Sequence, residues 1–273
     1  MGYEPRRFEK FESADAAVSQ LFPLGEWEQE SAQPLRTPLA TITGAHFGYD
    51  LLGTAPGLMD FASETLRCII HESTPTLVDT AYDDLMSKLW RIGQGKLFSI
   101  DNAAVRRWAY ARLRSMPTIT WKAGDAFIKG ASMDFVRLSP WYGTTQFSQT
   151  TAITITPQVV SVTNTGNFPI YNAVLILRGT FVDPTITNTT NGYTFGTTRD
   201  GAGATNYLKI DAGRHTVQWS TNSGGTYADD YALYTRPLSQ VALMKLEPGA
   251  NSLSIAGRTG TTNLDVSFYP AFH

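Results

Sequence analysis

The chain has 273 residues, of which 42% are hydrophobic, 12% aromatic and 17% charged, a size sufficient for two compact domains. Its 22 Lys and Arg against 24 Asp and Glu give a formal net charge of -2, which disfavours a basic protein that binds nucleic acid or an anionic membrane. A single cysteine allows neither an internal disulfide nor a cluster of cysteines around a metal, so we expect the fold to depend on buried apolar area.

The first 38 residues are the least patterned part of the sequence. They carry much charge and contain Pro5, Pro23, Pro34 and Pro38. We expect an extended N-terminal arm over residues 1–38, with a loosely ordered terminus as the alternative. Charges stand where a secretory signal needs an apolar core, and no later segment approaches the roughly 20 apolar residues of a membrane span. We therefore expect synthesis in a cytosol and no insertion into a membrane.

Residues 39–145 predict an α+β domain that consists of a sheet and one main helix. The strand segments alternate in polarity or are rich in β-formers: LATITGAHF, ETLRCIIHE, KLFSID, VRRWAYARLR, TITWK and AFIKGASMDFVRL. The helix lies between the second and third of them. Ser73 or Thr74 is its expected N-cap, Pro75 fits its first turn, and Gly93 ends it.

The expected helix has an apolar stripe that repeats every four residues: Leu77, Ala81, Leu85 and Leu89, flanked by Tyr82 and Ile92. We predict that Leu77, Leu85 and Leu89 face the sheet, because the opposite side of the helix is charged. GQGK, which begins at Gly93, is too short for a phosphate loop and is interpreted as the stop of this helix.

Composition changes in the stretch Pro140–Thr150. Through Gln149 there are 15 Lys and Arg and 17 Asp and Glu, and from Thr150 on there are 7 and 7. Short alternating segments separated by turn residues follow, among them AITIT, VVSVT, YNAVLILRG, NYLKID and HTVQWS. This pattern predicts an all-β antiparallel sandwich over residues 146–273. Near its end, EPGANSLSI predicts a tight turn at Gly249 that is capped by the side chain of Asn251.

No catalytic, cofactor-binding or metal-binding residue is predicted. The four histidines lack the spacing of a local metal pair: they are His46, His71, His215 and His273. Cys68 lies in the apolar segment LRCII, which favours a buried and unreactive thiol. The chain is therefore predicted not to be an enzyme, and a hydrolase whose acid–base pair forms only on folding is the alternative.

Three acidic or glycine-rich segments are interpreted as structural rather than as catalytic, cation or phosphate sites. Asp83 and Asp84 are neighbours on a helix and point in different directions. Asp229 and Asp230 favour a turn over a weak cation site. The segment GAGAT, which begins at Gly201, is expected in a loop that opens no helix and so offers no phosphate site.

Carbohydrate binding is a further hypothesis for the second half. Its aromatic residues could provide stacking platforms: Tyr193, Phe195, Trp219 and Tyr227. The alternation of His215, Val217 and Trp219 places these three on one face of a strand, and this favours a core position for the tryptophan.

Several segments in order resemble the distal tail (Dit) proteins of long-tailed bacteriophages. In the first half they are TLVDTAYDDLMSKLW with the glycines and KLFSID after it, VRRWAYARLRSMPTITW, and AFIKGASMDFVRLSPWYG. In the second half they are VTNTGNFPIYNAVLILRGTFVDPTITN, NYLKIDAGRHTVQWS and ALMKLEPGANSLSIAG. The resemblance covers roughly Leu58–Tyr269. The long N-terminal arm is less typical of that family.

The resemblance implies a tube-like (belt) first domain that forms a ring, with six copies as the number expected from this family, and a galectin-like sandwich as second domain. It implies a structural protein of the virion tail tip, made in the cytoplasm of the bacterial host, that joins the tail tube to baseplate or tail-tip proteins. A receptor-binding protein or a host surface glycan is an additional expected partner. The His-x-Asn-x-Arg and Trp-x-x-Glu residues of galectins are absent from RHTVQWS. No cofactor and no sequence-specific nucleic acid are expected.

Two other functions stay open: a glycan-binding adhesin of the tail tip, and a tail tube subunit with a decoration domain. The adhesin requires an exposed aromatic cleft, whereas the hub requires contacts between subunits. We expect those contacts along VRRWAYARLR and AFIKGASMDFVRL, where unpaired strand edges and apolar surface exceed what one helix can cover. Four arginines are expected either at the polar rim of this contact or on solvated strand faces: Arg106, Arg107, Arg112 and Arg114.

Overall fold

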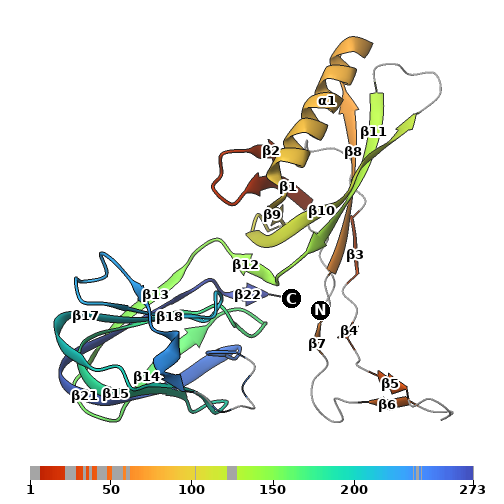
Figure 1. Cartoon of the computed structure of the whole chain (residues 1–273). Coiled ribbons are helices and arrows are strands. Elements are labelled where there is room, and N and C mark those ends of the chain that lie inside the picture. Colours follow the sequence, from red (N-terminus) through yellow and green to blue (C-terminus); the bar gives the residue numbers. More distant parts are fainter. Residues whose placement is uncertain are drawn as a thin grey trace. The chain divides into compact units, whose positions relative to one another are not determined.

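A computed structural model describes residues 7–21, 29–32, 35–36, 39–41, 48–50, 58–59, 62–101, 103–121, 128–235, 237, 240 and 242–272. The chain divides into two compact units, Met1–Pro140 and Trp141–His273. His46 and His273 lie outside the described residues. Both units are built mainly from antiparallel strands, which Figure 1 labels in chain order.

The first unit is an antiparallel sheet with one described α-helix. The strands run in the order β2–β1–β9–β10–β11–β8–β3 across the sheet. Their bounds are β1 (Arg7–Ser13), β2 (Ser19–Leu21), β3 (Gln29–Ala32), β8 (Ala62–His71), β9 (Gln94–Ile100), β10 (Arg106–Trp121) and β11 (Ile128–Arg137). Two short pairs lie apart from this sheet: β4 (Leu35–Arg36) with β7 (Leu58–Met59), and β5 (Leu39–Thr41) with β6 (Gly48–Asp50). The predicted combination of a sheet with one main helix is confirmed for the described residues.

Part of the segment that was expected to be an N-terminal arm belongs to this sheet. β1 pairs with β9, and a shift of register between Phe8 and Lys10 leaves Phe8 and Phe11 both buried, at 1% and 0% exposure. The ring of Phe11 meets that of Phe135 edge to face, with centroids 5.0 Å apart. The described part of residues 1–38 therefore differs from an extended arm, because these two side chains attach it to the core.

The helix α1 (Pro75–Ile92) begins and ends as predicted. The hydroxyl of Thr74 accepts the backbone N–H of Leu77 at 3.3 Å, and Pro75 lies in the first turn. Gly93 follows the last turn with a φ of +60°, which glycine adopts without strain. The cap and the stop therefore both follow from the local sequence.

The buried face of α1 differs in one position from the predicted stripe. Val78, Leu85, Leu89 and Ile92 are 0%, 5%, 1% and 5% exposed, whereas Leu77 is 46% exposed. Each step of four residues turns the side chain about 40° past a full turn, so an unbroken i, i+4 series drifts off one face. Steps of seven, four and three residues correct this drift. The prediction is confirmed for Leu85 and Leu89 and is wrong for Leu77.

Truncation of a leucine should lower the free energy of unfolding on the buried face of α1 and not on its exposed face. We expect Leu85→Ala to lower the free energy of unfolding of the first unit by about 2 to 5 kcal/mol, because the residue is buried. The matched change Leu77→Ala on the exposed side should cost no more than about 0.5 kcal/mol. Amide hydrogen exchange in α1 and β9 under increasing denaturant measures this unit alone. Equal losses in the two variants would contradict the assignment of faces.

The second unit is a β-sandwich. The strand order is β13–β21–β15–β17–β18–β19, with β14 beside β21, and β16 beside both β15 and β20. The strands are β12 (Trp141–Gly143), β13 (Phe147–Ile153), β14 (Gln158–Asn164), β15 (Val174–Asn188), β16 (Tyr193–Thr197), β17 (Gly201–Asp211), β18 (Thr216–Ser220), β19 (Ala228–Asp229), β20 (Tyr234–Thr235), β21 (Gly249–Phe268) and β22 (Ala271–Phe272). A single 3-10 turn, η1 (Tyr231–Leu233), precedes β20.

Two long strands, β15 and β21, contribute to both layers of the sandwich. The first half of β15 pairs with β17 and its second half with β16, while β21 pairs first with β14 and then with β13. The register between the two long strands shifts between Phe181 and Thr185. Gly179, with a φ of +114°, lies so close to β21 that a Cβ would stand 2.0 Å from the carbonyl oxygen of Thr261. Gly257 has a φ of +88° on the other strand, so both strands bend at glycines.

The first and last strands of the second unit lie side by side. β12 pairs with β22, with Trp141 opposite Phe272. The backbone N–H of Gly143 donates to the carbonyl oxygen of Pro270 at 2.9 Å. Phe147 stacks on Phe268 with ring centroids 4.6 Å apart. Residues before Thr150 are therefore part of this unit's structure.

We predict that the fragment 141–273 folds on its own. It should be soluble and rich in β-structure, because it contains both partners of every strand pair named above for the second unit. The shorter fragment 150–273 lacks β12 and the Phe147 ring and should be less stable by about 2 kcal/mol or more. Thermal unfolding followed by circular dichroism compares the two. A longer fragment that stays unfolded at low temperature, or equal melting temperatures, would contradict this prediction.

The predicted turn near the start of β21 is confirmed. Gly249 has a φ of +86°. The side chain of Asn251 accepts the N–H of Glu247 at 2.8 Å and donates to the carbonyl oxygens of Glu247 and Gly249 at 2.8 and 3.1 Å. Leu253 and Ile255 then return to the core at 0% and 1% exposure. The asparagine side chain thus replaces backbone partners that the turn leaves unpaired.

Candidate functional site

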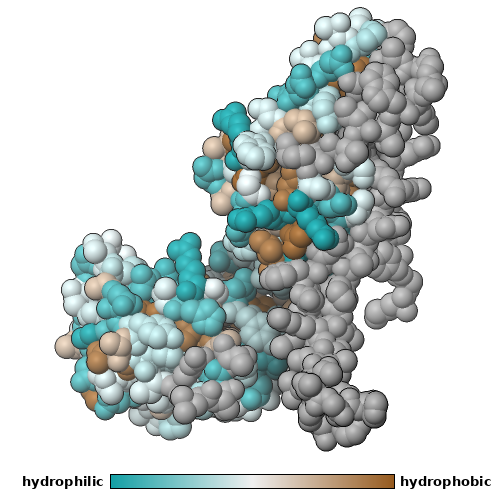
Figure 2. Space-filling model, turned by 45° about the vertical axis from the view of Figure 1, so that its right-hand side comes forward, coloured by the Kyte–Doolittle hydropathy of each residue, from teal (hydrophilic) through white to brown (hydrophobic). Residues whose placement is uncertain are grey.

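Large hydrophobic side chains are exposed at separate positions of the described surface. On the face in Figure 2, brown residues occur in small groups among teal and pale ones. Trp90 is the most exposed large hydrophobic residue among those that the structure describes, at 74%. The others are Leu21, Leu77, Val105, Tyr110, Ile155, Val159, Tyr171, Val182 and Tyr231. An exposed tryptophan is uncommon enough to mark a candidate contact.

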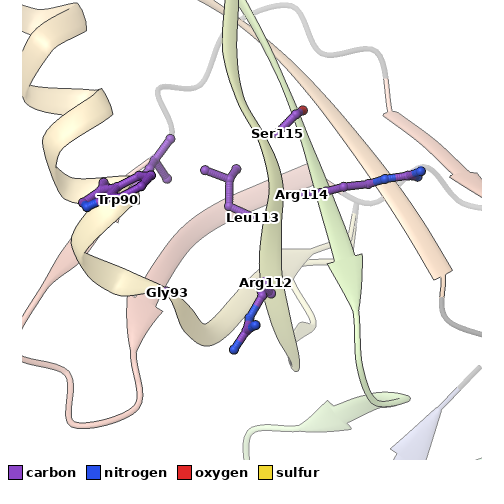
Figure 3. A pocket seen from close by; sticks show the side chains of 7 residues that line it. Trp90, Gly93, Arg112, Leu113, Arg114 and Ser115 are labelled. Carbon is purple, nitrogen blue, oxygen red and sulfur yellow. The ribbon is translucent and has the colours of Figure 1, made fainter.

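Trp90 stands beside an open pocket of about 310 Å³ in the first unit. The lining residues are Leu89, Trp90 and Gly93 from the end of α1, and Arg112, Leu113, Arg114 and Ser115 from β10. In Figure 3 the side chain of Leu113 points towards Trp90, whereas that of Arg114 points away from α1. The pocket therefore combines an aromatic wall, an aliphatic floor and the guanidinium of Arg112 nearby.

Local structure explains why these side chains face solvent. Trp90 is twelve residues after Val78, which turns it about 120° from the buried face of the helix. On β10, the register with β11 shifts between Leu113 and Ser115. Leu113 precedes this shift and shares its side of β10 with the buried Ala109 and Ala111, and it points towards Trp90 of α1 (Figure 3), whereas the shift after it interrupts the regular alternation next to the pocket. The sequence contains no motif that indicates the exposed position of Trp90 or the register shift in β10.

The structure does not bring the four arginines of β10 together at one rim. The Nη2 atom of Arg106 lies 2.7 Å from Oε1 of Glu9 in a largely exposed ion pair. Arg107 is half-buried, and burial lowers the pKa of its guanidinium while the charge of Asp101 opposes this shift. These two arginines therefore have structural surroundings on the side of β1 and the β9–β10 turn.

Arg112 and Arg114 are exposed, and within the described residues neither forms an ion pair. Arg112, Trp90 and Leu113 make a surface of the composition that protein interfaces favour: tryptophan and arginine around an apolar centre. No nucleophile with an adjacent base lines this pocket. This composition makes the surface a candidate for a protein contact.

The histidines and the cysteine are placed apart. His215 is exposed in the turn before β18 with a φ of +53°, so it does not share the face of Val217 as predicted. His71 and Cys68 lie in β8, as expected for an apolar strand, and their side chains are outside the described ones. Among the described residues no three His, Cys, Asp or Glu side chains gather as a metal site would require.

Asp229 ends the short strand β19, and Asp230 lies between β19 and η1, where it has a role that the sequence did not indicate. Asp230 is 4% exposed and accepts hydrogen bonds from Nε and Nη2 of Arg199. This hydrogen bonding raises the pKa of Arg199. The guanidinium carbon also lies 5.5 Å from the ring centroid of Trp219. Asp230 is therefore a structural partner within the sandwich.

The aromatic residues that were considered as a sugar platform do not form one exposed cleft. Phe195 is fully buried and stacks with Tyr234 at 5.0 Å. Trp219 is half-buried between Phe181, at 6.0 Å edge to face, and Arg199. Tyr193 and Tyr227 are also half-buried, and Lys209 covers the ring of Tyr227 at 5.3 Å. The core position predicted for Trp219 is thus only partly reached.

The segment from Gly201 to Thr205 is the start of β17 rather than a loop. Gly201 pairs with Phe181, and a Cβ on it would stand 2.8 Å from that ring, which explains the glycine. The side chain of Asn206 accepts the N–H groups of Ala202 and Gly203 at 2.8 and 2.9 Å. The next element along the chain is the strand β18.

Comparison with known sequences identifies no relative: no family model matches the chain, and no curated protein matches it. The described part of the chain also contains no helix long and apolar enough to cross a membrane. The fold is nevertheless similar to that of a solved phage protein.

The crystal structure of the Dit protein of phage SPP1 aligns with 98% of this chain and 99% of its own, at a TM-score of 0.56 and 14% sequence identity. It is described as a paradigm of the hub adsorption apparatus in phages that infect Gram-positive bacteria. The predicted resemblance to Dit proteins is confirmed at the level of the fold. Two structures of the activated phage p2 baseplate, with Sr and with Ca, align at TM-scores of 0.47 and 0.45 and identities of 9% and 8%. They cover 98% and 96% of this chain and 100% and 98% of their own.

Proposed function

We propose that this chain is a structural protein of a phage tail tip: a distal tail hub that forms a ring and joins the tail tube to baseplate or tail-tip components. The observation that carries the proposal is the alignment with SPP1 Dit over both units, because a hub role depends on the arrangement of the whole chain. The candidate site agrees with a structural role, since it presents contact residues and no reacting group.

In this proposal the first unit, Met1–Pro140, supplies the ring-forming belt, and the second unit, Trp141–His273, supplies a galectin-like sandwich that carries receptor-binding parts. The ring contact includes the pocket beside Trp90. Trp90 is the most exposed large hydrophobic residue that the structure describes, at 74%, so its burial with Leu113 and Arg112 against a neighbouring copy would remove apolar surface from water. A contact between two different surfaces of adjacent copies closes into a ring, and six copies is the number that the Dit resemblance suggests.

The purified chain should form rings with an open lumen in negative-stain images, and light scattering should give a multiple of the 30.0 kDa chain mass. Trp90→Ala should weaken this assembly about tenfold or more, as expected for a contact centred on a tryptophan. Leu77→Ala is the matched control, because it truncates another exposed apolar residue of the same helix. It should leave assembly unchanged.

A chain that stays monomeric at high concentration, alone and with a tail tube, would contradict the hub and favour a glycan-binding adhesin. Rings that stack into continuous tubes would favour a tail tube subunit instead. If Trp90→Ala assembles as well as the unchanged chain, the proposed ring stands, but the pocket beside Trp90 is not the contact between its copies.

A further inference from the structure

β14 is an edge strand of the sandwich, with hydrogen-bonding groups directed away from its only described neighbour, β21. Ser161 lies opposite Ser252 in this pair. Ser252 uses its own backbone towards β15, since its carbonyl oxygen accepts the N–H of Thr189 and its N–H donates to the hydroxyl of Thr190. The two serines are therefore a non-hydrogen-bonded pair, and the N–H and C=O of Ser161 point outward.

A second hydrogen bond supports this direction. The side-chain amide of Gln149 on β13 donates to the carbonyl oxygen of Ser161 at 3.2 Å from outside the β14–β21 pair. Because strand geometry repeats every two residues, Val159 and Thr163 direct their backbone groups the same way. The side chains of these three alternate residues are exposed, Val159 at 63%.

This edge lacks the usual protection against strand pairing. Natural edge strands are commonly guarded by lysine, by proline within the strand or by a bulge. No Asp, Glu, Lys or Arg occurs between Arg137 and Arg178, a stretch that contains all of β13 and β14. β14 itself contains no proline, and its register with β21 is unbroken. In a chain of 17% charged residues, this uncharged edge is suited to the addition of another strand.

We propose that β14 pairs antiparallel with β14 of a second copy of this chain, around a two-fold axis at Ser161. The reversed strand places Ser161 opposite itself and Val159 opposite Thr163 of the second copy. Val159 and Thr163, which then face each other, are both β-branched and similar in size, Ser161 faces a second serine, and no like charges meet. The carbonyl oxygen of Ser161 keeps a second lone pair, so the bond from Gln149 can persist. This contact is independent of the ring contact at Trp90.

Disulfide trapping in the full-length chain tests the register, on a Cys68→Ser background that removes the native thiol. Ser161→Cys should form a covalent dimer under mild oxidation, because facing residues of a hydrogen-bonded pair have Cα atoms about 5.5 Å apart, within disulfide range. Thr163→Cys alone should not link, since its copies stand four residues apart, about 13 Å. A mixture of Val159→Cys and Thr163→Cys chains should link as a heterodimer.

A charge swap tests the same contact without cysteines. The double variant V159K/T163K places lysine opposite lysine and should abolish dimers in sedimentation velocity, whereas V159K/T163E places lysine opposite glutamate and should retain them. Failure of Ser161→Cys to link, equal linking at all three positions, or equal behaviour of the two charged variants would overturn the proposal. Ring formation is read separately from the lumen in negative-stain images, so loss of the ring and loss of this pairing are distinguishable.

Discussion

Arg137→Met should destabilise the first unit by about 3 to 5 kcal/mol, because it removes a buried cation that donates to the carboxylate of Glu64. The two side chains are 3% and 0% exposed, and Nε of Arg137 donates to Oε1 of Glu64 at 3.0 Å. The guanidinium also donates to the carbonyl oxygen of Ser139 at 3.2 Å. Residues on β8 and β11 are thus joined at the end of the sheet, directly before the chain leaves the first unit.

The control for this effect is the double variant Glu64→Gln with Arg137→Met. It removes both charges and should recover about 2 kcal/mol or more relative to Arg137→Met alone, because a neutral amide costs less to bury than a carboxylate that has lost the charge of Arg137. Hydrogen exchange in β8 and β11 gives the free energy of unfolding of this unit. A double variant as unstable as the single one would show that the ion pair is not the source of the loss.

Gly179→Ala should destabilise the second unit by about 3 kcal/mol or more, since the added methyl group meets the carbonyl oxygen of Thr261 and the backbone is held at positive φ. Backbone on a neighbouring strand cannot move aside as a flexible side chain can. A Cβ at position 179 would lie 2.0 Å from the carbonyl oxygen of Thr261, because β15 and β21 run close together where they bend between the two layers.

Gly192→Ala is the matched control for the bend. Gly192 has a φ of +78°, and a Cβ there would meet nothing within 4 Å. The change should cost only the left-handed backbone penalty, about 1 to 2 kcal/mol. Thermal unfolding of the fragment 141–273 compares the two variants. Similar melting temperatures would mean that the steric approach at Gly179 is relieved in solution.

Local signals in the sequence were sufficient for elements whose ends are chemically marked. The Thr74 cap, Pro75 and Gly93 define α1 because each acts on backbone groups within a few residues. The turn at Gly249 is predictable for the same reason, since Asn251 satisfies it from two residues away. The prediction that Leu77 is buried was wrong because it extended the i, i+4 repeat over three turns. Each such step turns the side chain about 40° past a full turn, so Leu77 lies off the buried face.

Features that join distant segments could not be predicted in this way. Glu64 and Arg137 are 73 residues apart, and each stands in a strand whose alternation looks like an exposed polar position. Asp230 is buried and accepts a hydrogen bond from Arg199, which lies 31 positions earlier in the chain. Two adjacent aspartates in a sequence instead favour a turn exposed to solvent. Both ion pairs form only when strand order is known.

The N-terminal strand shows how an irregularity hides a core element. Phe8 and Phe11 are three positions apart. Two residues on one face of a regular strand are an even number of positions apart, and a single i, i+3 pair is not enough to predict a helix. The bulge between Phe8 and Lys10 brings both rings to the same side. Similarly, Trp90 stands between Leu89 and Arg91 with no motif around it, and only the position of β10 beside it creates a candidate contact site.

The continuity of β15 and β21 through both layers of the sandwich has a mechanical consequence. In sandwiches whose layers are linked by loops, tension on one layer reaches the other through side-chain packing, which can slip. Here the same covalent backbone runs through both layers, and the two strands are hydrogen-bonded to each other on both sides of the bend. Tension applied to one layer is therefore carried into the other along peptide bonds, and the layers cannot slide apart without breaking that central strand pair.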